Sequence, residues 1–170
     1  MRDHNGMRPL DIVVLMKLIA LKDNIWQYRD LSASLFISIS EISESLNRSM
    51  IAGLINSERK KVMRNALMEF IQYGVHYVFP EVPGAIVTGI ETAHSHPFYK
   101  KHFASNMPYV WPAVDGNARG QAIHPLHKGV IKAVKQDEKL YKLLASVDIL
   151  RVGKVREINL AITELKSYIL

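Results

Sequence analysis

The chain has 170 residues, of which 48% are hydrophobic and 22% are charged, and this composition is typical of a globular protein rather than a disordered one. The absence of cysteine excludes a disulfide framework and any cysteine-ligated zinc, and it fits a reducing cytoplasm. The formal net charge of +6 favours a polyanionic partner, although many other soluble proteins are equally basic.

The first predicted element is a helix over residues 10–21, with Pro9 at its first position. Its apolar run is interrupted by Lys17 and is too short to span a bilayer. No signal peptide precedes it, so we expect a cytoplasmic protein. Because the helix is apolar almost all round, it needs cover on more than one side.

The next segment, residues 29–55, predicts two short helices that cross steeply. Leu31 and Leu35 lie four residues apart on the first, and Ile42 and Leu46 lie four apart on the second. Small residues separate the apolar positions, as two closely approaching backbones require. The segment therefore predicts a helix-turn-helix.

Polar residues mark the start and the exposed face of the second helix. Ser38 occupies the N-cap position, and Glu41 three residues later completes a capping box. We expect four side chains on this helix to read base edges: Ser40, Ser43, Asn47 and Arg48. Asparagine can pair with adenine through two hydrogen bonds, and arginine suits guanine or phosphate.

This segment resembles the winged helix-turn-helix of bacterial MarR-type regulators, including the closing Ala-Gly-Leu-Ile of residues 52–55. Similarity to such regulators extends over nearly the whole chain, through Phe79 to Gly84, Thr92 with Ala93, Trp111 with Pro112, and residues 147–157. The resemblance implies a wing over Asn56 to Arg64. Phosphate contacts are then expected from Arg29, Ser38, Arg59, Lys60, Lys61 and Arg64.

Three features depart from that pattern. Phe36 stands where the turn usually has a glycine with positive φ, so we expect a longer or differently shaped turn. Glu41 and Glu44 place negative charge on the face that should meet DNA, and the wing is short. A winged-helix scaffold used for protein contacts, such as an antitoxin-like partner, is therefore the alternative.

The middle of the chain contains an internal repeat. Tyr77-Val78-Phe79-Pro80 recurs 32 residues later as Tyr109-Val110-Trp111-Pro112, and glycines follow each copy at matching positions. Each copy predicts an aromatic strand ended by proline and reversed by a glycine turn. We therefore expect two similar hairpins.

Histidines raise the question of a metal site. His94 and His96 form a His-x-His pair, and His124 and His127 lie three residues apart. Zinc needs three or four converging ligands, and no diagnostic spacing is present, so we expect neither a metal nor another cofactor. The chain also lacks the sequence motifs of a nucleophile elbow, a phosphate-binding loop or a dinucleotide fold, so we expect no enzyme activity.

Two patterns stand out in the last third of the chain. Five lysines at steps of four and three would share one helical face: Lys128, Lys132, Lys135, Lys139 and Lys142. Asp137 and Glu138 could break that helix midway. The last helix carries an apolar seam of Val155, Ile158, Ile162, Leu165 and Ile169. This seam packs within the chain or against a second copy, and together with the apolar first helix it favours a homodimer.

The resulting prediction is a mainly α protein with a small β component. Residues 1–74 would form a winged helix-turn-helix domain, 75–127 a module with the duplicated hairpin, and 128–170 C-terminal helices for dimerisation or a partner. The expected function is that of a homodimeric, sequence-specific transcriptional regulator that binds double-stranded DNA. A third hypothesis has the histidine-bearing repeats sense a metal or small ligand.

Overall fold

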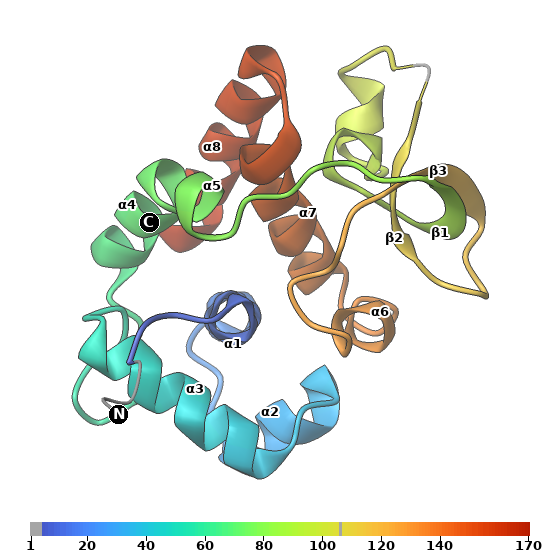
Figure 1. Cartoon of the computed structure of the whole chain (residues 1–170). Coiled ribbons are helices and arrows are strands. Elements are labelled where there is room, and N and C mark those ends of the chain that lie inside the picture. Colours follow the sequence, from blue (N-terminus) through green and yellow to red (C-terminus); the bar gives the residue numbers. More distant parts are fainter. Residues whose placement is uncertain (1–4, 106) are drawn as a thin grey trace.

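The chain in this computed structural model is mainly helical, with one small sheet (Figure 1). The structure describes residues 5–105 and 107–170. The helices are α1 (Pro9–Leu21), α2 (Tyr28–Leu35), α3 (Ile39–Ile51), α4 (Arg64–Tyr73), α5 (Val75–Val78), α6 (Val130–Ala133), α7 (Glu138–Val152) and α8 (Val155–Ile169). The strands are β1 (Ile86–Thr92), β2 (Tyr109–Pro112) and β3 (Ala118–Ala122), with short 3-10 turns η1 (Ala93–Ser95) and η2 (Tyr99–Lys101). The predicted fold class, mainly α with a small β component, is confirmed.

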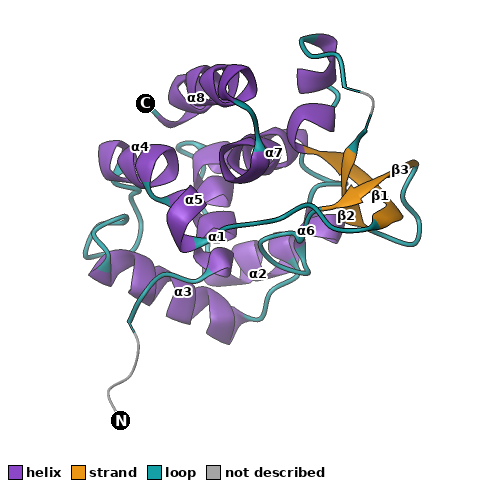
Figure 2. Ribbon diagram, turned by 45° about the horizontal axis from the view of Figure 1, so that its top comes forward, coloured by secondary structure: helices purple, strands orange, loops and turns teal. Residues whose placement is uncertain are grey.

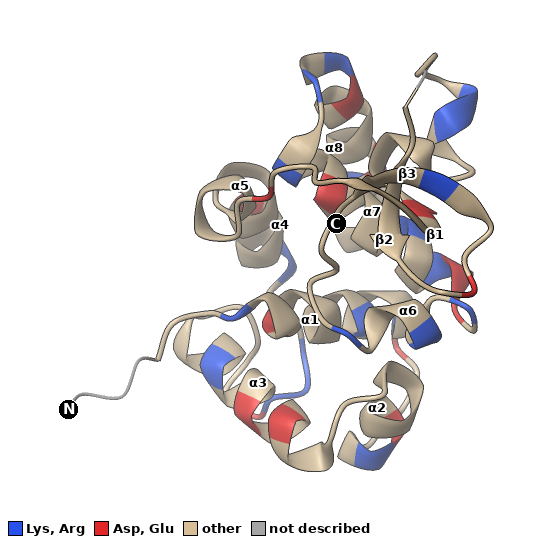
Figure 3. Cartoon of the chain, turned by 45° about the vertical axis from the view of Figure 1, so that its right-hand side comes forward, with Lys and Arg blue, Asp and Glu red and all other residues tan. Residues whose placement is uncertain are grey.

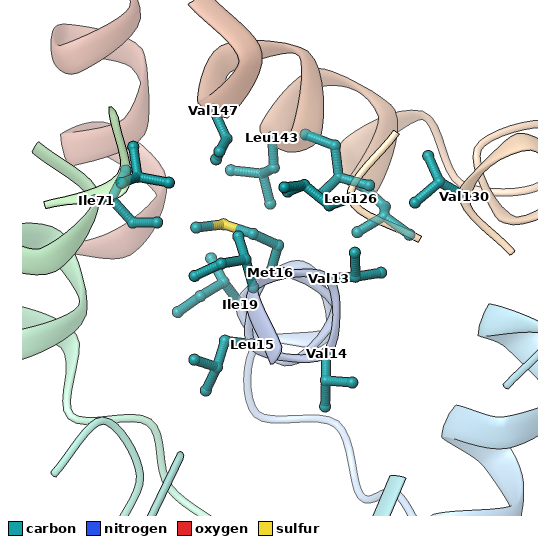
Figure 4. Close-up of a cluster of buried hydrophobic side chains, with 14 of the residues drawn as sticks. Val13, Val14, Leu15, Met16, Ile19, Ile71, Leu126, Val130, Leu143 and Val147 are labelled. Atoms are coloured by element: carbon teal, nitrogen blue, oxygen red, sulfur yellow. The ribbon is translucent and has the colours of Figure 1, made fainter. Parts of the chain in front are cut away.

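Helix α1 is the centre of the core. Every residue from Leu10 to Ile19 is buried, and α1 contacts α2, α3, α7 and α8. Figure 4 shows its side chains directed toward Ile71 of α4, Val130 of α6 and Leu143 of α7. The all-round apolar surface is therefore covered within one chain, and it no longer argues for a second copy.

Helix α1 also carries charges that the core can hold because each is paired. Lys17 lies 2.7 Å from the carboxylate of Asp137, the N-cap residue of α7. Asp11 is fully buried against an arginine of α3 that is described below. These two ion pairs fix α1 to α7 and to α3, since a buried charge without a partner is strongly unfavourable.

Helices α2 and α3 form as their spacing predicts. The four apolar residues that defined them, Leu31, Leu35, Ile42 and Leu46, are all fully buried. The Ser38 hydroxyl accepts the backbone N–H of Glu41 at 3.2 Å, and the Glu41 carboxylate accepts that of Ser38 at 3.3 Å. This exchange confirms the predicted capping box.

The turn between α2 and α3 differs from the prediction. Phe36 adopts the left-handed conformation, with φ of 57° and ψ of 43°, so the turn has the ordinary shape and our expectation of another one was wrong. The strain of a bulky residue there is offset by neighbouring contacts. Lys132 lies 5.6 Å from the Phe36 ring, and Gly129 packs against the backbone of residues 35–36.

A tight loop follows α3. Ile55 and Val62 form an isolated antiparallel bridge, and the Asn56 N–H donates to the Lys61 carbonyl at 2.9 Å. The Asn56 side chain accepts the backbone N–H groups of Lys60 and Lys61 at 2.9 and 3.0 Å. We call residues 56–61 the basic loop. It is a minimal hairpin in which the Asn56 side chain binds two backbone N–H groups.

The three strands form a closed ring in which each pairs with the other two. Strand β1 runs antiparallel to β2, with Gly89 opposite Pro112, and antiparallel to β3, while β2 and β3 are parallel. So small a ring needs close backbone contact, and a Cβ on Gly89 would lie 2.1 Å from the Trp111 carbonyl oxygen. The ring lies on one side of α7, and α4 and α5 lie on the other (Figure 1, Figure 2).

The internal repeat does not form two similar hairpins. Tyr77 and Val78 end the helical turn α5, whereas the matching residues Tyr109 and Val110 begin β2. Tyr77 is 80% exposed, whereas its counterpart Tyr109 is half-buried. Trp111, which matches the buried Phe79, donates from Nε1 to Asp148 of α7 at 2.7 Å. The predicted duplication was wrong, because tertiary partners decide the conformation of these short aromatic segments.

A buried polar cluster holds the strands to α7. Asp148 accepts Thr92 Oγ1 at 2.8 Å, Trp111 Nε1 at 2.7 Å and Arg151 Nη1 at 2.9 Å. Arg151 also donates to the Phe79 carbonyl at 2.9 Å, which ties in the chain after α5. Since each group has partners, the cluster is a structural joint between α7 and both flanking segments.

The lysine stripe is also interrupted. The chain turns between α6 and α7, and the Asp137 side chain caps α7 by accepting the Leu140 N–H at 3.0 Å. Lys135 pairs with Asp115, and Lys142 pairs with Glu164 at 2.7 Å. The predicted break at Asp137 is confirmed, and the five lysines do not share one helical face.

Helix α8 begins at Val155 as predicted, and its seam packs within the chain. Leu165 and Ile169 are fully buried, whereas Val155 at the start of the seam is 74% exposed. The helix contacts α7 and α4. The surface of α1 and the C-terminal half of the α8 seam are thus covered internally, and a homodimer stays a prediction.

The hydrophobic core is continuous across the predicted domain boundaries near residues 74 and 127. One cluster of buried side chains includes Leu67 of α4, Trp111 of β2 and Leu143 of α7. Among the described residues, no helix is long and apolar enough to cross a membrane.

Candidate nucleic-acid interface

The outward face of α3 combines short polar, acidic and apolar side chains. Ser40 is exposed, Ser43 and Asn47 are half-buried, and Glu41 and Glu44 are exposed. Figure 3 shows acidic segments on α3. Two large apolar side chains near the ends of the helix, those of Ile39 and Ile51, are each 52% exposed. Short polar side chains allow close approach to base edges, whereas the carboxylates repel phosphates.

Arg48 does not belong to this face, which corrects our expectation that it reads bases. Its guanidinium is buried and donates from Nε to Asp11 Oδ2 at 2.9 Å and from Nη2 to Asp11 Oδ1 at 2.7 Å. The hydrogen bonds with Asp11 raise the pKa of Arg48, so the guanidinium keeps its charge inside the core. Arg48 therefore joins α3 to α1, and its side chain cannot reach a ligand without breaking this pair.

The basic loop lies against the C-terminal half of α3. Arg59 donates from Nη2 to the Asn47 side-chain oxygen at 3.0 Å. Arg59 itself has a positive φ of 57°, which the turn of the loop requires. Asn47 thus has a second role, because the side chain expected to read a base also positions the loop that was expected to contact phosphate.

Lys60 and Lys61 project from the loop and are both exposed. The Lys60 ammonium lies 4.4 Å from the centre of the Trp26 ring, which stacks on Tyr28 at 6.2 Å between ring centres. A cation–π contact of this kind orients an exposed lysine and leaves its charge in solvent. The aromatic pair therefore fixes where the loop presents its positive charge.

Arg64 is used elsewhere, which corrects a second expected phosphate contact. Its Nη1 donates to the carbonyl oxygen of Ile169 at 2.9 Å and more weakly to that of Tyr168 at 3.4 Å. These carbonyls end α8, where the helix dipole favours a cation. Of the other two predicted contacts, Arg29 is exposed on the first turn of α2, and the exposed Ser38 is engaged in the capping box.

The structure adds cations at the other end of α3 that the sequence had assigned to a separate stripe. Hydrogen bonds from Ser38, and then the nearby His127 and Lys128, hold the pKa of Glu41 below its usual value. Lys132 is exposed beside the α2–α3 turn, over Phe36. Positive charge therefore borders the acidic face of α3 at both ends. The lysine spacing showed a basic segment, but it gave no sign of this location.

The histidines are dispersed. His94 and His96 are buried near the strands, His124 contacts Glu81, and His127 accepts the Gly129 N–H at 3.0 Å. Within the described part of the chain, no three histidine, aspartate or glutamate side chains converge as metal ligands would.

Comparison with known proteins gives no match among protein-family models, curated proteins or solved structures. The geometry of α3 and the basic loop therefore carries the functional argument.

Proposed function

We propose that this protein binds double-stranded DNA through a winged helix-turn-helix made by α1 to α4, and that it regulates transcription. The proposal is supported by the arrangement of α2 and α3 over α1, and by the basic loop that follows them. The single observation that carries it is the contact between Arg59 and Asn47, which places a cationic hairpin beside the exposed face of α3. The resemblance to MarR-type regulators agrees with this arrangement.

The contacts divide by chemistry. Ser40, Ser43 and Asn47 of α3 would face base edges, since all three retain exposed surface. Phosphates would be contacted by Arg29, Arg59, Lys60 and Lys61, with the Ser38 hydroxyl beside them. Arg48 and Arg64 are no longer part of the proposed interface, because Arg48 is buried in an ion pair with Asp11 and Arg64 caps the last carbonyls of α8.

A protein partner is the second candidate function, and one observation favours it. Glu44 and Ile51 are seven residues apart, so these two exposed side chains share one face of α3, and a basic protein with an apolar patch would fit it. Such a partner would be recovered from cell extract in stoichiometric amount after nuclease treatment. Loss of that recovery in a Glu44→Lys variant would assign the contact to α3.

The test is DNA binding by the purified chain and by variants that leave the fold intact. Lys60→Ala is expected to weaken binding to all sequences alike and to reduce the salt slope by about one unit. Ser43→Ala is expected to change affinity by less, and only for a cognate sequence. Lys101→Ala is the matched control, because this lysine is exposed on η2 at the sheet end of the molecule.

The variants separate the outcomes. If Lys101→Ala reduces the salt slope as much as Lys60→Ala does, the binding reports the net charge of the protein and the proposed interface is wrong. If both bind as the unmodified chain does, the basic loop does not contact DNA.

A further inference from the structure

A polar hollow separates the strands from the corner between α7 and α8. Its volume is about 490 Å³, within the range of small-molecule sites. It is lined by His94 of η1, Tyr109 of β2, Gln121 of β3, and Lys154 and Glu157 at the start of α8. None of these residues belongs to the proposed DNA interface, so the hollow has to be explained separately.

His94 and Glu157 face each other without a hydrogen bond. The Nε2 atom of His94 lies 3.2 Å from the carbonyl oxygen of Met107, which can only accept, so Nε2 carries a proton. In the neutral ring Nδ1 is then a bare acceptor, and it lies 3.9 Å from Glu157 Oε1, which is also an acceptor. Two acceptors at this distance leave room for one donor between them.

His94 is only 6% exposed, and the other oxygen of Glu157 is already used. Glu157 Oε2 accepts the backbone N–H of Lys154 at 2.7 Å and so caps α8. This capping role explains why a carboxylate occurs at position 157. It does not explain why Oε1 lies 3.9 Å from His94 Nδ1 with no hydrogen bond between the two atoms.

The remaining lining groups are also free to bind. In the described part of the chain, the Tyr109 hydroxyl, the Gln121 amide and the Lys154 ammonium make no side-chain hydrogen bond or ion pair. Burial, and then the charge of Glu157, raise the pKa of Tyr109, so its hydroxyl stays protonated as a donor. The Tyr109 ring lies 4.5 Å from that of His94 and forms one wall.

We propose that this hollow binds a small zwitterion of the α-amino acid class. Its ammonium group lies between Glu157 Oε1 and His94 Nδ1 and donates to both acceptors. Its carboxylate pairs with Lys154 and accepts from Gln121. A positive and a negative side chain on the same first turn of α8 select a ligand that carries both charges. This inference does not depend on DNA binding.

The experiment uses the purified full chain and the common L-amino acids, each added alone. At about ten times its dissociation constant, a bound amino acid is expected to raise the unfolding temperature by about 3–6 °C. Glu157→Gln and Lys154→Ala are expected to abolish that rise. Glu164→Gln is the matched control, because Glu164 lies on the same helix but pairs with Lys142, and this variant should retain the rise.

Two further measurements make the proposal refutable even if a variant folds poorly. The 2-hydroxy analogue of the bound amino acid, which lacks the ammonium group, should produce no rise with the unmodified chain. Nitrogen NMR of His94 without ligand should show an unprotonated Nδ1 at neutral pH. A protonated Nδ1 would mean that His94 pairs directly with Glu157, and it would overturn the proposal. The same conclusion follows if no amino acid raises the unfolding temperature.

Discussion

The buried ion pair between Arg48 and Asp11 allows a quantitative prediction that separates a structural arginine from a base-reading one. Asp11 is fully buried and also accepts the Arg8 N–H at 2.8 Å, so its carboxylate has donors from Arg8 as well as from Arg48. Arg48→Ala removes the charged partner and leaves that carboxylate uncompensated. Loss of one member of such a pair costs about 3–5 kcal/mol, and we expect this loss in the free energy of unfolding.

The assay is urea unfolding followed by circular dichroism. The double variant Asp11→Asn, Arg48→Met is the matched control, because the asparagine still accepts the Arg8 N–H and the methionine fills the space of the guanidinium stem. Replacing both charges is often neutral or stabilising, so the double variant should recover most of the lost stability.

One result would refute this reasoning. If Arg48→Ala changes the free energy of unfolding by less than about 0.5 kcal/mol, Arg48 has the energetics of a surface residue. If the same variant also lost DNA affinity, the original assignment of Arg48 to a base contact would be restored.

Three other predictions address separate parts of the molecule. Gly129→Ala should destabilise the protein by about 1–3 kcal/mol, because its Cβ would lie 2.3 Å from the Leu35 carbonyl oxygen. Gly53→Ala should cost less, because Gly53 has a φ of 76° but no atom near the added Cβ. Thermal unfolding of both variants measures this order, and a reversed order would contradict the contact between Gly129 and Leu35. Burial, with Lys142 and Lys100, lowers the pKa of His96 to about 4. Since the unfolded chain takes up this proton near pH 6.5, stability should fall by about 3 kcal/mol as the pH drops from 7 to 4. The His96→Gln variant should lack this loss of stability at low pH. If the difference in unfolding free energy between the variant and the unmodified chain does not change with pH, the lowered pKa of His96 is contradicted. Arg64→Ala should lower the free energy of unfolding by about 1–2 kcal/mol, because the last carbonyls of α8 lose their donor. The salt dependence of DNA binding should not change. A flatter salt slope for this variant would return Arg64 to the interface.

Local sequence patterns predicted α1, α2, α3 and α8, but not α4 or α5. The spacing of Leu31, Leu35, Ile42 and Leu46, together with the Ser38–Glu41 capping box, depends on residues within a few turns of each other. The start of α8 at Val155 has the same origin. Helices whose start and buried face are set by nearby residues could therefore be predicted from the sequence.

The errors concern partners that are distant in sequence. Arg48 lies at a position of α3 where exposure was plausible, and only the packing of α1 brings Asp11, 37 residues away, to its guanidinium. Tyr77 and Tyr109 occur in nearly the same four-residue motif, yet only the second segment has neighbouring strands with which to pair. Sequence periodicity contains no information on such partners, so it could not separate Arg48 from Asn47 or α5 from β2.

The most direct test of DNA binding is titration of the purified chain against its own upstream DNA and a scrambled duplex at several salt concentrations. Four cationic side chains in the interface, Arg29, Arg59, Lys60 and Lys61, predict a slope of log affinity against log salt of about −3 to −4. A specific regulator should also prefer the upstream duplex by about a thousandfold. Equal, weak binding to both duplexes would show only that the protein is basic, and no binding to either would contradict the proposed function and direct attention to a protein partner of α3.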